Sequence, residues 1–105
     1  MKNHYTIYEI LARIRLRPAM YLGKCSLIRL RAFVEGCTFM AQEFGVESRD
    51  HPDFGAFHDW VAQRFGWRES TAGWCNIILE ECGDDDQKAL ESFFELVDDY
   101  RRQSA

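Results

Sequence analysis

Apolar residues recur along this chain at the three- and four-residue spacing of amphipathic helices, and no stretch alternates for long as a half-buried strand does. The first such stretch covers residues 6–16. Its apolar stripe comprises Ile7, Ile10, Leu11 and Ile14. Thr6 and Glu9 at its start form a capping box, in which each side chain satisfies a free backbone N–H. Pro18 disfavours helical backbone at the residue before it, so we expect the chain to turn there.

The second predicted helix covers about residues 26–44. Ser26 is suited to its N-cap, and Gly45 is suited to its C-terminal end. A strong apolar stripe runs along the whole helix. It comprises Leu30, Phe33, Val34, Cys37, Met40, Ala41 and Phe44.

Two shorter helices follow. The third covers about residues 53–65, and Asp53 can cap it. Its apolar face comprises Phe54, Phe57, Val61 and Phe65. The fourth covers about residues 72–82, and Ser70 or Thr71 can cap it.

The last predicted helix opens at Asp84, with Gln87 three residues on as a second capping box. Its apolar stripe comprises Leu90, Phe93, Phe94, Val97 and Tyr100. Arg101 and Arg102 fall where a helix C-terminus favours cations. With a length of 105 residues and a hydrophobic content of 47%, this pattern predicts one compact all-α domain over residues 1–105, a bundle of about five helices.

The net charge of −4 hides a strong asymmetry along the chain. Residues 1–31 carry seven Lys and Arg against one acid, Glu9. Residues 78–100 carry nine acids against one base, Lys88. The basic half can cover the acidic half within the chain, or the acidic half can face a basic partner, and the sequence leaves both open.

Residues that could carry chemistry form no recognisable catalytic or metal site. The four cysteines lack the spacing of zinc ligands, so we expect reduced, mostly buried thiols and no metal or cofactor. His58 and Asp59 could act as an acid–base pair, but no nucleophile accompanies them, and we expect no enzyme. The acidic run 84–86 lacks the alternate-residue spacing of a calcium loop. The acidic total argues against a nucleic-acid partner.

The chain also lacks the signals of membrane or secreted proteins. No apolar run reaches the roughly 18–20 residues that a membrane span needs. The first eighteen residues are amphipathic with arginines among them, unlike a secretory signal. We therefore expect a cytoplasmic protein with no membrane partner.

Residues 17–23, Arg-Pro-Ala-Met-Tyr-Leu-Gly, are similar to a segment of gyrase B-type ATPases, Arg-Pro-Gly-Met-Tyr-Ile-Gly. In those ATPases the next helix carries a catalytic glutamate and, four residues on, an asparagine that holds Mg²⁺. Here the matching positions hold Glu35 and Phe39, and a phenyl ring cannot ligate a metal. The Asp-x-Gly-x-Gly nucleotide loop is missing as well. We interpret the similarity as coincidental, a shared local turn without ATPase chemistry.

Motifs spread over nearly the whole chain carry a wider resemblance. They are Arg-Pro-x-Met-Tyr-Leu-Gly, Ser-Leu-x-x-Leu, Phe-x-x-Gly, Phe-x-x-Trp-Val, Ser-Thr-x-Gly-Trp and Phe-Phe-x-Leu-x-Asp-x-Tyr-Arg. The chain resembles a family of small bacterial cytosolic proteins encoded beside polymorphic toxins of contact-dependent or type VI systems. That resemblance implies an immunity protein, which binds its cognate toxin and occludes the active site. Cys37 departs from the family pattern, which often has an aromatic residue there.

An immunity protein for a basic toxin needs an acidic surface, and toxins that act on anionic substrates have basic clefts. The candidate partner-binding residues are Glu80, Glu81, Asp84, Asp85, Asp86, Glu91, Glu95, Asp98 and Asp99, with Trp67 as an exposed aromatic anchor. These acids can equally be ordinary solvated charges. The alternative function is a non-enzymatic helical adaptor or regulator, and the oligomeric state stays open.

Overall fold

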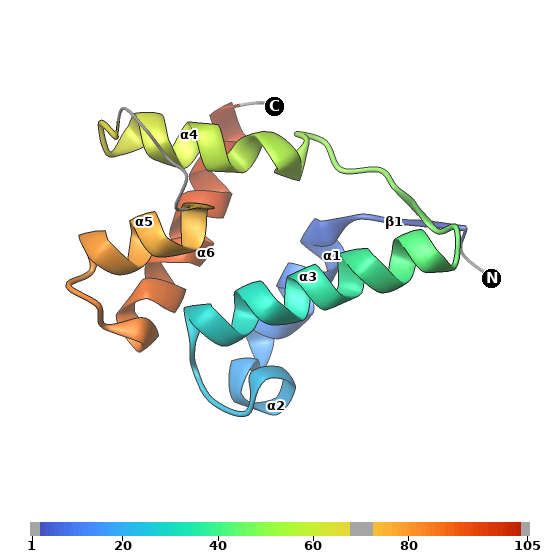
Figure 1. The fold of residues 1–105 in the computed structure, drawn as a ribbon, viewed down its shortest axis with the longest axis horizontal. Coiled ribbons are helices and arrows are strands. Elements are labelled where there is room, and N and C mark those ends of the chain that lie inside the picture. The colour runs from blue at the N-terminus through green and yellow to red at the C-terminus, as the bar shows by residue number, and fades with distance from the viewer. Residues whose placement is uncertain (1–2, 68–72, 104–105) are drawn as a thin grey trace.

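Six α-helices make up most of the chain in the part that the structure, a computed structural model, describes, residues 3–67 and 73–103 (Figure 1). They are α1 (Ile7–Leu16), α2 (Pro18–Leu22), α3 (Leu27–Glu43), α4 (Phe57–Arg64), α5 (Gly73–Glu81) and α6 (Asp86–Gln103). A 3₁₀ turn, η1 (Phe54–Ala56), leads into α4. The all-α fold class predicted from the spacing of apolar residues is confirmed.

Local capping signals place the starts of α1 and α3 correctly. The Thr6 hydroxyl accepts a hydrogen bond from the Glu9 amide at 3.2 Å, and the Ser26 hydroxyl accepts one from the Arg29 amide at 3.1 Å. The turn expected at Pro18 is instead the short helix α2. Proline suits the first helical position, because its fixed φ is helical and its missing N–H is not needed there.

The sequence pattern does not predict the small parallel sheet formed by β1 (His4–Tyr5) and β2 (Glu47–Ser48). Two residues per strand are too few to show an alternating period. The sheet ties the start of α1 to the chain that follows α3. Asp50 strengthens this link, because its carboxylate accepts a hydrogen bond from the Ile7 amide at 2.7 Å.

The prediction that Asp84 opens the last helix is wrong by one residue. Gly83 and Asp84 both have left-handed backbone, with φ of 65° and 64°, and the Asp84 amide donates to the Leu79 carbonyl at 2.8 Å. These residues therefore complete the end of α5. Asp85 caps α6 instead, accepting from the Lys88 amide at 3.1 Å. The proposed caps of α5, Ser70 and Thr71, lie outside the described residues.

The core is centred on an aromatic cluster between α4, α5 and α6. Phe57 is fully buried there. Its ring lies 5.2–6.0 Å, centroid to centroid, from those of Phe54, Trp60, Trp74, Phe93 and Tyr100. Helix α3 contributes Leu27, Leu30 and Val34, all from its N-terminal half.

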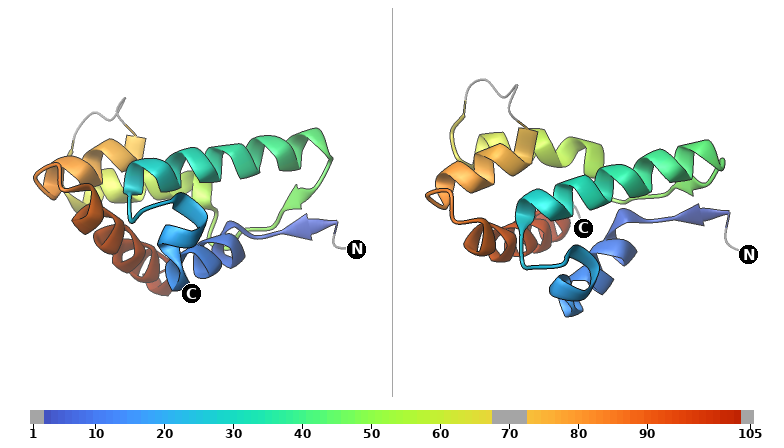
Figure 2. Two further views of the ribbon diagram at one scale, coloured as in Figure 1. Left: turned by 90° about the horizontal axis from the view of Figure 1, so that it is seen from below. Right: turned by 60° about the horizontal axis from the view of Figure 1, so that its bottom comes forward.

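The C-terminal half of α3 lies outside the core, against expectation. The predicted stripe continues beyond Val34, but Met40 is 50% exposed and Phe44 is 75% exposed. Figures 1 and 2 show why: this half of α3 extends beyond α4, α5 and α6, and the strands β1 and β2 lie beside it. The predicted stripe is therefore buried only in the N-terminal half of α3, because the core does not extend far enough to cover the rest.

Candidate partner-binding surfaces

Five of the nine acids expected to face a partner bind groups of their own chain. They are Glu81, Asp85, Asp86, Asp98 and Asp99. The structure therefore divides the nine acids into carboxylates that hold the fold together and carboxylates that remain available to bind a partner.

Asp86 is a structural link between α3 and α6. The hydroxyl of the buried Ser26 donates to one carboxylate oxygen, and the Ile28 amide donates to the other at 3.1 Å. Asp86 thus satisfies backbone and side-chain donors at the N-terminus of α3 while sitting in the first turn of α6. Its carboxylate is occupied from within the chain.

Asp98 and Asp99 are paired with arginines. Arg15 of α1 places one guanidinium nitrogen 2.9 Å from each oxygen of Asp98. Asp99 pairs with Arg64 at 3.4 Å and also with Arg102. The basic N-terminal half therefore covers the acidic C-terminal helix at Asp98. At this residue, the structure shows the first of the two arrangements that the sequence left open.

Trp67 is not the exposed anchor that was expected. Its ring is half-buried against the core, and its indole N–H donates to the Glu81 carboxylate at 3.1 Å. Trp67 and Glu81 hold each other in place, because the N–H of an indole packed against the core usually needs a hydrogen-bond acceptor. Neither of them is a free contact group.

The other four acids are Glu80, Asp84, Glu91 and Glu95. Within residues 3–67 and 73–103, none of them has an ion pair or a side-chain hydrogen bond. Glu91 and Glu95 lie four residues apart on α6, so they share one face of the helix. Glu80 and Asp84 lie at the end of α5 and in the turn after it.

Glu91 and Glu95 line a groove of about 340 Å³ between the α1–α2 junction and α6. Leu90 and Phe94, both buried, form its apolar floor. The remaining lining residues are Arg15, Pro18, Cys25 and Gln87. Two carboxylates that have no counter-ion among the described residues therefore border an apolar surface.

The groove continues between α1 and α6 into a second hollow of about 270 Å³, which shares Arg15 and Phe94 with the first. Leu16, 83% exposed, borders this part. At its far end the Arg101 guanidinium lies 4.3 Å from the centroid of the Tyr8 ring. The two hollows form one surface, called here the α1–α6 groove.

Arg15 shows what this groove can bind. Its guanidinium carbon lies 5.4 Å from the centroid of the Phe94 ring while its nitrogen pairs with Asp98. A cation is thus held by an aromatic face and a carboxylate at once. Glu91, Glu95 and Asp98 follow a spacing of four and three along α6, so they lie on one face of the helix. Glu91 and Glu95 therefore also place a carboxylate next to the apolar floor, but no arginine of the described residues pairs with them.

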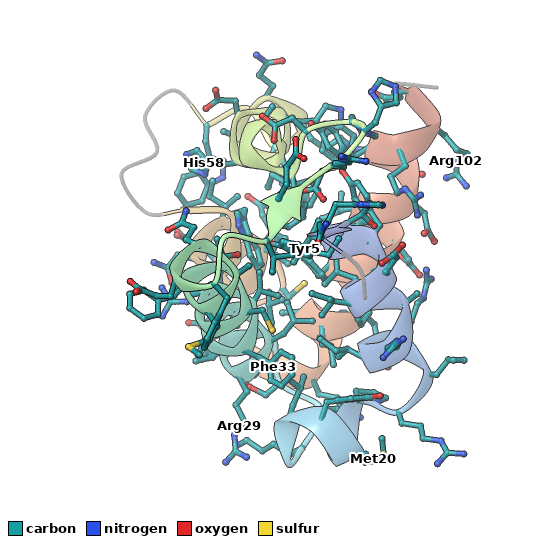
Figure 3. The ribbon with its side chains drawn as sticks, turned by 90° about the vertical axis from the view of Figure 1, so that its right-hand side faces the viewer. Tyr5, Met20, Arg29, Phe33, His58 and Arg102 are labelled. Carbon is teal, nitrogen blue, oxygen red and sulfur yellow. The ribbon has the colours of Figure 1, made fainter. Side chains whose placement is uncertain are left out.

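A second surface lies on α3 and its neighbours. Between α1 and α3 is an apolar hollow of about 340 Å³, where Tyr21 packs edge-on against Phe33 at 6.3 Å. Figure 3 shows Phe33 between α3 and α2, with Met20 at the outer edge of α2. Burial raises the pKa of Cys37, which also lines this hollow. Met20 is exposed.

A third hollow, of about 460 Å³, lies between α3 and α4 and holds Glu35 and His58. Cys75 also lines it, but burial raises the pKa of this thiol and keeps it protonated, which disfavours a nucleophilic role. In the part of the chain described, no group of three or more His, Cys, Asp or Glu residues could hold a metal ion. None of the described helices combines the length and apolarity needed to cross a membrane.

Comparison of the chain with protein-family models, curated proteins and solved structures found no match.

Proposed function

We propose that this protein is a non-enzymatic immunity protein, which binds and neutralises a basic antibacterial toxin domain in the bacterial cytoplasm. One observation carries the proposal. Glu91 and Glu95 have no counter-ion among the described residues and border an apolar groove, while the next acid on the same helix face, Asp98, is occupied by Arg15. The motif resemblance supplies the toxin as the partner.

The chemistry of the groove favours an arginine or lysine side chain of the partner. The aliphatic stem packs on Leu90 and Phe94, and the charged head pairs with Glu91 and Glu95. Such pairs, partly removed from water, fix the register of an interface and increase the rate of association. A basic cleft that binds an anionic substrate offers the complementary side chains, so occupying it prevents substrate binding.

The acids predicted from the sequence then have different roles. Glu91 and Glu95 make the direct contacts, and Asp98 lies at the edge of the groove. Glu80 and Asp84 contribute to the long-range attraction, which salt screens. The remaining acids and Trp67 support the fold.

The proposal is tested by affinity capture from the native lysate at low and moderate salt, followed by identification of the stoichiometric partner. The partner's gene is then expressed in bacteria, alone and together with this protein. We expect growth arrest with the partner alone and recovery on co-expression.

A stoichiometric partner that is harmless when expressed would contradict the immunity function and support the alternative of a helical adaptor. A toxic partner whose effect persists on co-expression would contradict neutralisation. A catalytically inactive variant of this toxin serves as the ligand for the binding measurements below.

A further inference from the structure

Helix α3 presents a second apolar stripe to solvent, away from its core residues. At 100° per residue, one side of α3 carries positions 28, 32, 36, 39 and 40, each within about a third of a turn of Gly36. Ile28, Phe39 and Met40 are large exposed side chains on this outer face, and Phe39 is 60% exposed. The buried residues Leu27, Leu30 and Val34 lie on the other side of α3.

Gly36 lies at the centre of this face, and the folded chain gives no reason for a glycine there. Apart from its chain neighbours and the backbone of its own helix, a Cβ atom at Gly36 would meet no heavy atom of the described residues within 4 Å. Glycine inside a helix is less stable than alanine, and this position lies mid-helix without a positive φ to require it. Its exposed backbone allows another helix to approach closely.

The charges on the outer face are arranged symmetrically about Gly36. Arg29 and Glu43 each lie seven residues from it, and neither has an ion pair among the described residues. Arg29 donates one hydrogen bond, to the Leu22 carbonyl at 2.9 Å, which leaves other N–H donors of its guanidinium available. Figure 3 shows Arg29 beside α2 at the edge of the molecule.

We infer that two copies of this chain associate through this face, with their α3 helices antiparallel and a two-fold axis at Gly36. In that arrangement Arg29 lies opposite Glu43 of the second copy, and Ala32 lies opposite Met40. Ile28 then lies level with Phe44 along the helices, on the opposite flank of the interface. A two-fold interface must be self-complementary in this sense, because the same patch serves both copies.

The exposed apolar area suits a dimer. Ile28, Phe39, Met40 and Phe44 each expose roughly 100 Å². With the polar atoms around them, two copies bury on the order of 1,000 Å² in total, which reaches the lower limit of specific interfaces. Stable homodimer interfaces are also the more apolar ones, as this face is. The α1–α6 groove lies on other elements and stays open in the dimer.

Sedimentation equilibrium of the full chain tests the inference, with a dimer of twice the 12.3 kDa chain mass as the expected result. Gly36→Gln places a side chain in space that is open in one copy but filled in the dimer. We expect circular dichroism to show an unchanged helical fold and the dimer to weaken on the order of tenfold or more. Ala12→Gln is the matched control, since it adds a similar side chain at an exposed position of α1.

Crosslinking tests the orientation of the two helices. Gly36→Cys brings two thiols together at the two-fold axis, so oxidation is expected to give a covalent dimer above the wild-type background. Thr38→Cys, on another side of α3, is expected to give none above that background. A monomeric wild type, or a dimer indifferent to Gly36→Gln, would overturn the inference.

Discussion

The hydroxyl of Ser26 donates a hydrogen bond to the carboxylate of Asp86, and this pair joins the N-terminal turns of α3 and α6 across 60 residues of sequence. Ser26 is buried, and the second carboxylate oxygen of Asp86 accepts from the Ile28 amide. An acid that looks like part of a charged surface in the sequence is therefore a connecting element of the fold.

Replacing Asp86 is expected to cost stability. Asp86→Ala leaves the buried Ser26 hydroxyl and the Ile28 amide without their acceptor, and we expect the free energy of unfolding to fall by about 2–3 kcal/mol. Urea denaturation measures this. The matched acid Glu91, exposed and unpaired among the described residues, is expected to change stability by less than about 0.5 kcal/mol when replaced by alanine. Equal stability of the two variants would contradict the role of Asp86.

Removing the arginine that lines the α1–α6 groove is expected to strengthen its attraction for a basic partner. Arg15→Gln leaves Asp98 without its arginine partner, so three carboxylates then contribute negative charge to the groove. Because the pair is partly exposed, stability changes by less than about 1 kcal/mol. Stopped-flow association with the toxin domain at low salt is expected to become a few-fold faster. Slower association would show that Arg15 itself contacts the partner.

Two buried tyrosines are expected to make the fold sensitive to alkaline pH. Burial raises the pKa of Tyr8 well above 10.0 and raises that of Tyr100 in the same direction. The unfolded chain therefore loses these protons first, and stability, fully present below about pH 10, declines as the pH rises further. Tyr8→Phe is expected to reduce this decline in urea unfolding measured at several pH values. A parallel decline in wild type and variant would contradict the assignment.

The aromatic cluster is expected to dominate core stability. Phe57 is fully buried and contacts rings from η1, α4, α5 and α6. Phe57→Ala should lower the free energy of unfolding by about 3–5 kcal/mol. The exposed Leu16, replaced by alanine, serves as the control and is expected to change stability by less than about 0.5 kcal/mol. A loss below that of a surface substitution would place the core elsewhere.

Short-range signals in the sequence predict the helices well, because their causes are local. The Thr6 and Ser26 hydroxyls accept hydrogen bonds from backbone amides only three residues further on, and the apolar spacing within each helix sets its buried face. The error at Asp84 has a local cause too. The end of α5 requires two successive left-handed residues, and a capping-box pattern does not register that demand.

The candidate site could be predicted only as a composition, since its geometry depends on contacts between distant parts of the chain. Arg15 and Asp98 are 83 residues apart, so sequence alone could not show which acids are neutralised. Glu91 and Glu95 look like Asp98 in the sequence and differ from it only by what lies opposite. Similarly, the sequence shows the apolar stripe of α3, but it does not show that the core no longer covers this stripe at Met40.

The central claim is that Glu91 and Glu95 contact the partner. The most direct test is the dissociation constant of the toxin domain with the double variant Glu91→Gln, Glu95→Gln. Glu80→Gln, Asp84→Asn is the control, because it removes the same charge from acids outside the groove. We expect the groove variant to bind at least tenfold more weakly and the control to change binding only slightly, mainly at low salt. Equal weakening by the two variants would indicate that the acids act only through non-specific attraction. It would contradict the groove as the binding site.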